Sequence, residues 1–246
     1  MNWIRLFKWS AVVMALGALS IATLIWLVFL PPNGNSINRV KLEEKVVALT
    51  FDDGPNPIHT IALLEVLKKY RVKATFFMTG KYVEAHPATV LAVAEGGHEI
   101  SNHSYDATVL AFKSRRQIED SIDRSDAALR RALGPHYTVS RFFRAPKGRQ
   151  FLTLASILRD QGRTHVGASV LGYDWTKSSQ RNPSGIARAV LEGLEPGDII
   201  ALHDGDDRVD EENRAGTVLA VAQILQTLEA RGFRAVTVSE LLQLSD

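Results

Sequence analysis

The chain has 246 residues, a formal net charge of +2 and 23% charged residues, and it lacks the strongly basic character of nucleic-acid-binding proteins. Its apolar content of 46% is typical of a globular protein. The absence of cysteine excludes disulfides, thiolate metal sites and cysteine nucleophiles. We therefore expect no nucleic-acid partner. The roughly 210 residues after the first apolar stretch suffice for one large domain.

The first feature in chain order is a long segment without charge, residues 9–30. Its apolar core, Ala11–Leu30, has about 20 residues, which as a helix is long enough to cross the hydrocarbon layer of a bilayer. Arg5 and Lys8 precede this segment, and positive charges in such positions stay on the cytoplasmic side. We predict a single transmembrane signal anchor with its N-terminus in the cytoplasm.

A cleaved signal peptide is the alternative interpretation of the same residues. Such peptides have apolar cores of about 7–15 residues and small residues at the cleavage site, whereas this core is longer and ends in Ile-Trp-Leu-Val-Phe-Leu. Either interpretation places the rest of the chain outside the cytoplasm. The predicted organisation is a cytoplasmic tail, a transmembrane anchor, a linker and one globular domain, at residues 1–8, 9–30, 31–44 and 45–246.

The predicted domain alternates short apolar runs with helical patterns. One such helix begins at a capping box, Ser114–Gln117, and ends at Gly134. Repeated strand–helix alternation favours parallel strands, and about seven of them indicate an α/β fold, a distorted or incomplete (β/α) barrel. An open doubly wound sheet is the alternative. The predicted strands are Val46–Phe51, Ala74–Met78, His98–Asn102, Arg141–Arg144, His165–Val170, Asp198–His203 and Ala235–Val238.

Two adjacent carboxylates, Asp52 and Asp53, end the first of these strands just before a Gly-Pro turn. Neighbouring like charges at the end of a buried element are costly unless a cation or a proton takes up the charge. One carboxylate could bind a metal while the other moves a proton. A simple turn is the competing interpretation, because Asp, Gly and Pro all favour turns.

Other polar clusters follow the remaining predicted strands. In a parallel barrel the active site lies at the carboxyl ends of the strands, so these clusters are expected to meet at one rim. Their joint placement with the paired carboxylates favours a site over isolated structural residues. The clusters are Asn102-His103-Ser104, Arg144-Ala145-Pro146-Lys147-Gly148, Gly172-Tyr173-Asp174-Trp175 and His203-Asp204.

Together these residues resemble the polysaccharide deacetylase family, the NodB-homology domain of carbohydrate esterase family 4. The resemblance covers residues 45–244, and the stretch Thr50–Pro55 matches the first and most specific family motif. His103-Ser104 begins the second motif. The third, fourth and fifth are similar to Arg144–Gly148, Asp174-Trp175 and Leu202–Asp204.

The resemblance implies a role for each matching residue. Asp53 and His103 would bind a divalent metal, most commonly Zn²⁺, with Co²⁺ or another divalent ion as alternatives. Asp52 would be the general base, His203 the general acid, and Arg144 would hold Asp52 ionised and oriented. The Lys147 backbone N–H would stabilise the oxyanion. The implied substrate-binding residues are Pro146, Lys147, Asp174 and Trp175.

Two departures from the family pattern bear on activity. Ala107 stands where the family has its second metal-binding His, so two of the three protein ligands of a catalytic zinc site remain. A substitute ligand could come from Asp106, His59 or the acidic stretch 204–210, but none has the expected spacing. Leu171 occupies the position of the Asp that tethers the catalytic His, and Asp174 is the candidate replacement.

The resemblance implies a hydrolase of linear amide bonds: a metal-dependent N-deacetylase of an extracytoplasmic N-acetylated amino-sugar polymer or lipid-linked sugar. The expected partners are this glycan and the membrane. The alternative, motivated by Ala107, is a catalytically impaired homologue that binds glycan as a membrane-anchored scaffold.

Overall fold

The computed structural model describes residues 36–148, 150–176, 182–205 and 214–245. The predicted tail, the predicted membrane segment and the start of the predicted linker lie outside these ranges. Within them, no helix has both the length and the apolar character needed to span a bilayer.

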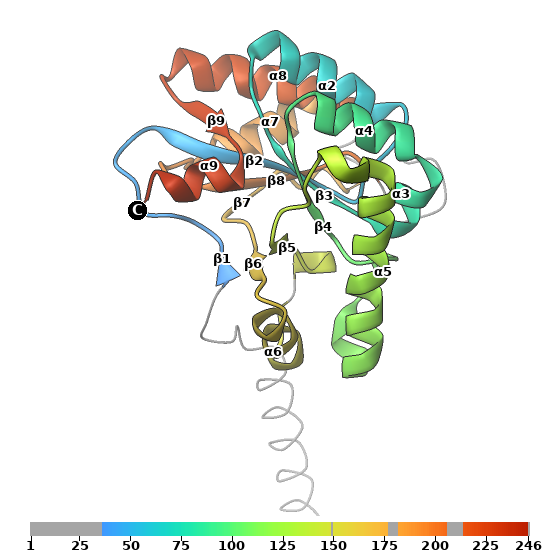
Figure 1. The fold of residues 1–246 in the computed structure, drawn as a ribbon. Helices are drawn as coiled ribbons and strands as arrows, with labels where there is room; N and C mark the ends of the chain where they lie inside the picture. Colours follow the sequence, from blue (N-terminus) through green and yellow to red (C-terminus); the bar gives the residue numbers. More distant parts are fainter. Residues whose placement is uncertain (1–35, 149, 177–181, 206–213, 246) are drawn as a thin grey trace, which may run out of the picture.

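The described residues form one parallel sheet surrounded by helices (Figure 1). Its strand order is β1-β6-β5-β4-β3-β2-β8-β7, and β9 lies off this path, paired with the first residues of β2. The strands are β1 (Ser36–Ile37), β2 (Val46–Asp52), β3 (Thr75–Met78), β4 (Glu99–Asn102), β5 (Phe142–Phe143), β6 (Thr164–Val166), β7 (Val170–Leu171), β8 (Ile199–His203) and β9 (Arg234–Val236).

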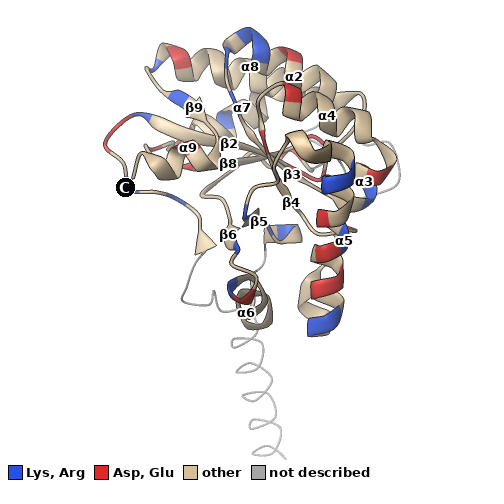
Figure 2. Ribbon diagram, viewed as in Figure 1, with Lys and Arg blue, Asp and Glu red and all other residues tan. Residues whose placement is uncertain are grey.

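Helices follow most of the strands. The longest, α5, begins with the predicted capping box, in which the Ser114 side chain accepts from the Gln117 N–H, and it ends at Gly134. Figure 2 shows charged residues spread over these helices, while the strands are mostly uncharged. The helices are α2 (His59–Tyr70), α3 (Gly80–Ala85), α4 (Pro87–Glu95), α5 (Arg115–Leu133), α6 (Leu152–Asp160), α7 (Pro183–Leu191), α8 (Ala215–Ala230) and α9 (Val238–Gln243).

The sheet must curl, and the connection from β6 to β7 shows why. Six strand-to-strand steps separate β6 from β7 in the order, which in a flat sheet would place them about 29 Å apart. Yet Val166 and Val170 are four residues apart in the chain and can be separated by at most about 14 Å. The sheet is therefore an incomplete barrel, as predicted, and not a flat open sheet.

The strand prediction was wrong at two places. The predicted strand His165–Val170 is two short strands, because the chain pairs with β1 as far as Val166 and then crosses to pair with β8 from Val170. Gly167 lies in this crossing, where a Cβ would lie 1.9 Å from the Asn38 side chain. Ser36–Ile37, assigned to the linker by the sequence, form β1 and pair with β6. The described sheet therefore has nine strands instead of about seven.

The alternation along β2 aims the first motif into the barrel. All seven residues are buried, and Val47, Leu49 and Phe51 pack in the cluster beneath the surrounding helices. Val46 and Ala48 pack in the inner cluster. Because strand residues alternate between faces, Thr50 and Asp52 point to the same inner side as Val46 and Ala48.

Candidate active site

Asp52 is held by a buried arginine at the carboxyl end of β2. Arg144, directly after β5, donates from Nη1 to Asp52 Oδ1 at 2.7 Å and to Thr50 Oγ1 at 2.6 Å. The other donors of the guanidinium bind the carbonyl oxygens of Val166 at 3.1 Å and Gly167 at 2.8 Å. Both charged side chains are buried, so this charge-assisted contact fixes the carboxylate in orientation.

Asp53 turns away from β2, and its side chain contacts His103. Its φ of 68° is left-handed, a region that Asp tolerates better than most residues. His103 Nε2 lies 3.3 Å from Asp53 Oδ1, and both residues are buried. Burial alone would raise the pKa of Asp53, but the hydrogen bond and charge of His103, together with His203 and Lys147, hold it below its usual range.

The position of His103 depends on Asn102, which sequence reasoning placed at the rim without giving it a role. Asn102, the last residue of β4, accepts from the Ser104 N–H at 2.7 Å and donates to Asp126 on α5 at 2.7 Å. The loop after β4 is thereby fastened to α5. Nδ1 of His103 is buried and has no protein hydrogen-bond partner among the described residues.

The Asp53–His103 pair fits two corners of a cation site. Two ligands bonded tetrahedrally at about 2.0–2.1 Å lie about 3.3 Å apart, the separation observed here. No group of three potential metal-ligating side chains occurs within the described residues. Of the substitutes considered, Asp106 is engaged by Thr108 and Lys113. The acidic stretch lies mostly outside the described residues.

Ala107, at the position where the family resemblance implies a histidine, has an unusual backbone conformation. Its φ is 54° and it is 2% exposed. Left-handed backbone disfavours alanine, whereas Asn, Asp and His are enriched there. The backbone at position 107 therefore has a geometry that would suit a histidine.

His203, the last residue of β8, is tethered by Asp174. Asp174 Oδ1 lies 2.8 Å from His203 Nδ1, and Oδ2 accepts from the His203 N–H at 2.9 Å and from Thr217 at 2.9 Å. The contact with Asp174 Oδ1 keeps a proton on Nδ1 of His203. Nε2 is therefore the nitrogen that can donate or accept a proton at the rim. Arg214 donates to the Asp174 carbonyl at 2.8 Å. Sequence reasoning missed both Thr217 and Arg214.

Two assignments to the substrate surface are corrected by burial. Asp174 is 0% exposed and bonded as described, so it positions His203 instead of contacting substrate. Asp174 thus supplies the carboxylate contact to His203 that the apolar side chain of Leu171 cannot make. Pro146 is also buried, so it supports its loop instead of presenting a surface. Lys147 is exposed with a φ of 62°, and Trp175 lies edge-on to His203 with 5.4 Å between ring centroids.

The loop that carries Lys147 rests on a buried histidine, His165. His165 is 2% exposed, because β1 and the loop after β5 cover it. Its Nε2 accepts from the Ala145 N–H at 3.2 Å, so Nδ1 carries the proton and donates to Ser36 Oγ at 2.8 Å. Burial, with the charges of Arg144 and His103, lowers the pKa of His165 to about 3. The ring is therefore neutral at ordinary pH.

A pH titration of the metal-free protein tests the His203 tether. Burial alone would lower the pKa of His203, but the charge and hydrogen bond of Asp174, with Asp53 and Asp52, raise it to about 9. Because this pKa is raised, the stability that protonated His203 contributes is complete below the unfolded value of about 6.5 and is lost as the pH rises through about 9. The His203 ring proton followed by NMR is expected to titrate near pH 9. In Asp174→Asn it should titrate at least about two units lower. An unchanged midpoint in that variant would contradict the tether.

Two glycines let the loops after β2 and β8 pack together. A Cβ on Gly54 would lie 2.2 Å from Asp204 Oδ2, and a Cβ on Gly205 would lie 2.1 Å from the Asp53 carbonyl oxygen. Asp204 itself is buried and accepts from Thr60 at 2.5 Å. Burial, with the charges of Asp52 and Asp53, raises the pKa of Asp204 to about 7.

Gly54→Ala is expected to destabilise the fold. The added methyl must displace the Asp204 carboxyl or the loop, and such overpacking costs about 1–3 kcal/mol. Chemical denaturation should show this loss of unfolding free energy. The double variant Gly54→Ala with Asp204→Gly removes the obstructing carboxyl and should recover at least half of the loss. No recovery would show that the clash is not with Asp204.

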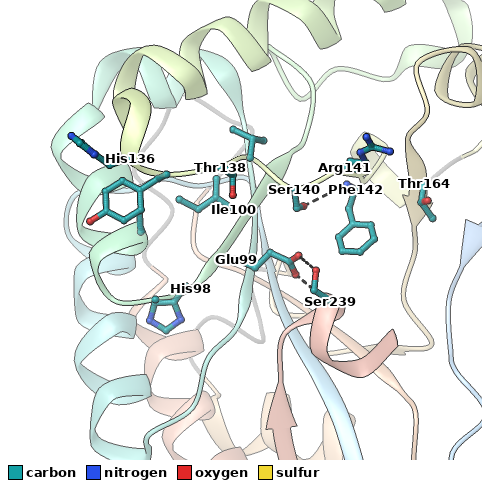
Figure 3. A pocket seen from close by; sticks show the side chains of 14 residues that line it. His98, Glu99, Ile100, His136, Thr138, Ser140, Arg141, Phe142, Thr164 and Ser239 are labelled. Carbon is teal, nitrogen blue, oxygen red and sulfur yellow. Dashed lines mark hydrogen bonds between the residues drawn. The ribbon is translucent and has the colours of Figure 1, made fainter. Parts of the chain in front are cut away.

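A separate hollow lies at the amino ends of the strands, away from this rim (Figure 3). It has a volume of about 740 Å³ and is lined in part by His98, Glu99, Tyr137 and Phe142. The Glu99 carboxylate is already used by Ser239 and by Thr75, the latter at 2.6 Å. This hollow brings none of the predicted site residues together.

Comparison with known proteins agrees with the fold and the motifs. The sequence profile described as "Polysaccharide deacetylase" matches residues 39–166. A peptidoglycan-N-acetylglucosamine deacetylase of Bacillus cereus is 33% identical over 218 residues, 87% of this chain and 96% of the relative. A chitooligosaccharide deacetylase of Sinorhizobium fredii is 37% identical over 192 residues, 76% of this chain and 87% of the relative.

Solved structures show the same architecture. A peptidoglycan N-acetylglucosamine deacetylase in complex with a substituted benzamide superposes with a TM-score of 0.78 at 30% identity, covering 85% of this chain and 93% of the other. A carbohydrate esterase family 4 pseudoenzyme from Bacillus anthracis superposes with a TM-score of 0.75 at 24% identity, covering 85% of this chain and 69% of the other. The chain belongs to the polysaccharide deacetylase family. The predicted class, hydrolases that cleave the amides of N-acetylated sugars, is confirmed by these relatives.

Proposed function

We propose that this protein is a hydrolytic N-deacetylase of N-acetylated amino-sugar glycans and that its cation is held by two protein ligands. The observation that carries the proposal is the pair of intact dyads, Asp52–Arg144 and His203–Asp174. Asp52 and His203 are direct neighbours in the register of β2 and β8, so a base and an acid stand side by side at the rim.

The two dyads divide the proton movements of amide hydrolysis. Asp52, oriented by Arg144, accepts a proton from the attacking water. His203, kept protonated at neutral pH by Asp174, donates a proton to the leaving amine. The Lys147 N–H stabilises the oxyanion of the tetrahedral intermediate, and Trp175 forms a wall beside the acid. The products are a free amine on the sugar and acetate.

Asp53 and His103 would hold a divalent cation, most commonly Zn²⁺. When bound, such a cation supplies Lewis-acid polarisation of the carbonyl and of water. Because Ala107 stands in the position of the family's second metal-binding His, we expect affinity well below that of a three-ligand site. Water and substrate would complete the coordination.

Ala107 also favours a second candidate function, a glycan-binding homologue without turnover. The family fold includes a protein described as a pseudoenzyme, and a mutant of it is described as having restored enzymatic activity. Such a protein would bind glycan through the same rim and serve as a scaffold in the cell envelope.

Acetate release separates the two functions. The purified full chain, supplied with excess Zn²⁺ or Co²⁺ and then with chelator, is assayed on chitooligosaccharides and on peptidoglycan. Chelator-sensitive acetate release supports the deacetylase. Saturable glycan binding with no acetate from any substrate supports the scaffold and contradicts the enzyme.

We also propose that residues 9–30 anchor residues 45–246 outside the cytoplasm. The support is the length of the uncharged segment and the basic residues that precede it. A reporter fused after residue 246 that is active only outside the cytoplasm should be active in intact cells. If a reporter that is active only inside the cytoplasm is fused at the same place and shows activity, this placement is contradicted.

A further inference from the structure

Residues 36–40, which we call the N-terminal strap, cross the seam of the incomplete barrel. At one end of the strap, β1 pairs with β6 (Figure 1). At the other end, the Val40 N–H donates to the Gly197 carbonyl oxygen at 2.9 Å, and Arg39 pairs with Asp198, the residue before β8. Because β6 and β8 do not pair with each other in the described part of the sheet, the strap joins the two sides of the seam.

An ion pair and a close backbone approach hold the strap against the β8 side. Arg39 Nε donates to Asp198 Oδ1 at 2.6 Å, and Asp198 is completely buried. Gly197 has a φ of 81°, and a Cβ there would lie 1.7 Å from the Val40 carbonyl oxygen. This position therefore accepts glycine alone while the strap is in place.

The strap holds the last part of β6, which β5 does not reach. Among the described residues, β5 pairs with β6 only at Thr164 and His165. Val166 pairs instead with Ile37, and the Gly167 N–H donates to the Ile37 carbonyl oxygen at 2.9 Å. The backbone of residues 166 and 167 thus takes its ladder contacts from the strap.

The same backbone fixes the arginine that orients the proposed base. The carbonyl oxygens of Val166 and Gly167 accept from Arg144 at 3.1 and 2.8 Å, and Arg144 Nη1 donates to Asp52 at 2.7 Å. Arg144 is buried, so its donors must be satisfied by protein acceptors, and the two carbonyls set the direction in which its remaining donors point. Hydrogen bonds therefore connect the strap to Asp52 without a break.

We propose that the N-terminal strap is a positioning element for the catalytic base and acts on Asp52 through the backbone of residues 166 and 167 and through Arg144. This inference rests on the proposed N-deacetylase function. A displacement of about 1 Å in a positioned group can cost about 100-fold in rate. Loosening the strap should therefore lower kcat, while KM should change little because the strap does not contribute to the rim surface.

A reversible covalent lock between positions 39 and 198 tests this role. Arg39 and Asp198 are partners in an antiparallel bridge, and such partners have Cα atoms about 4.5–5.5 Å apart, a separation that a disulfide can span. The chain has no cysteine, so Arg39→Cys/Asp198→Cys can form only this disulfide. Reduction should lower kcat about tenfold or more with KM within about twofold, and reoxidation should restore kcat. The assay uses whichever chain releases acetate, with or without Ala107→His.

Hydrogen exchange on the metal-free protein follows the same path without turnover. The Gly167 amide and the Arg144 Nε–H, observed by NMR, should both exchange at least about tenfold faster after reduction of the disulfide. The Leu49 amide, in the middle of β2, should not change. If only the Gly167 amide exchanges faster and kcat is constant, the strap merely closes the barrel and the proposal is overturned.

Gly197→Ala and Gly193→Ala are a matched pair that needs no disulfide. Both glycines lie between α7 and β8 with positive φ, 81° and 70°, so alanine strains the backbone at each position, but only at Gly197 would the added Cβ meet the strap. We expect kcat of Gly197→Ala to be about tenfold below that of Gly193→Ala. Equal kcat values would overturn the proposal. Absence of acetate from every chain would instead contradict the proposed function, and the exchange rates would still decide whether the strap holds Arg144.

Discussion

Ala107→His is expected to tighten divalent metal binding by about 100-fold or more, the effect of roughly 2.8 kcal/mol of added coordination. The backbone at position 107 is already left-handed, and the Asp53–His103 pair already has the spacing of two ligands. A histidine there would supply the third protein ligand that catalytic zinc sites normally have. Calorimetric titration with Zn²⁺ measures the affinity, and acetate release measures the activity, which should rise with it.

Ala107→Asn is the matched control for this change. Asparagine tolerates the same left-handed conformation, so it reproduces the backbone effect, but its amide is a poor zinc ligand. It should leave the metal affinity within about twofold of the natural chain. If the histidine variant binds metal no better than the asparagine variant, the remaining site has lost its geometry and the scaffold function gains support.

Asp52→Asn is expected to lower kcat by about 10³-fold, because it removes the proposed acceptor of the proton from water. The comparison is made in whichever chain releases acetate, the natural one or Ala107→His. The amide is nearly isosteric, so KM should change little. The loss of the negative charge leaves Arg144 buried without its counter-charge, so a fall in unfolding free energy of about 3 kcal/mol is also expected.

The control for this change is Asp123→Asn, on the exposed side of α5, which removes a carboxylate without touching the rim. It should keep both kcat and stability. If Asp52→Asn retains more than a tenth of the activity, another group accepts the proton. The metal-binding experiment on Ala107→His remains informative in that event.

The strand that ends in Asp52 and Asp53 could be predicted from the sequence, because the residues that define it are consecutive in the chain. An unbroken apolar run predicted a buried strand, and the structure extends it by a single residue, to Asp52. The capping box of α5 is similarly local, since Ser114 and Gln117 are three residues apart. The predicted rim also formed, because parallel strands bring their carboxyl ends to one edge whatever the lengths of the connections.

The supporting contacts could not be predicted, because they join residues that are far apart in the chain. Ser36 and His165 are separated by 129 positions, and nothing near His165 marks it as buried. Sequence reasoning gave Asp174 two possible roles, a substrate contact and a replacement tether for His203, and the distance of 2.8 Å to His203 Nδ1 favours the tether. Thr217 and Arg214 lie at the start of α8 and act on Asp174 only through the tertiary fold.

The bond between Ser36 and His165 has a practical consequence for recombinant production. A soluble fragment cut at residue 39, where the family profile begins, would discard β1 and the hydroxyl that fixes the buried imidazole. The loop that carries Lys147, the proposed oxyanion-binding residue, would then lose this support. Expression fragments intended for crystallisation or assay should therefore start upstream of Ser36.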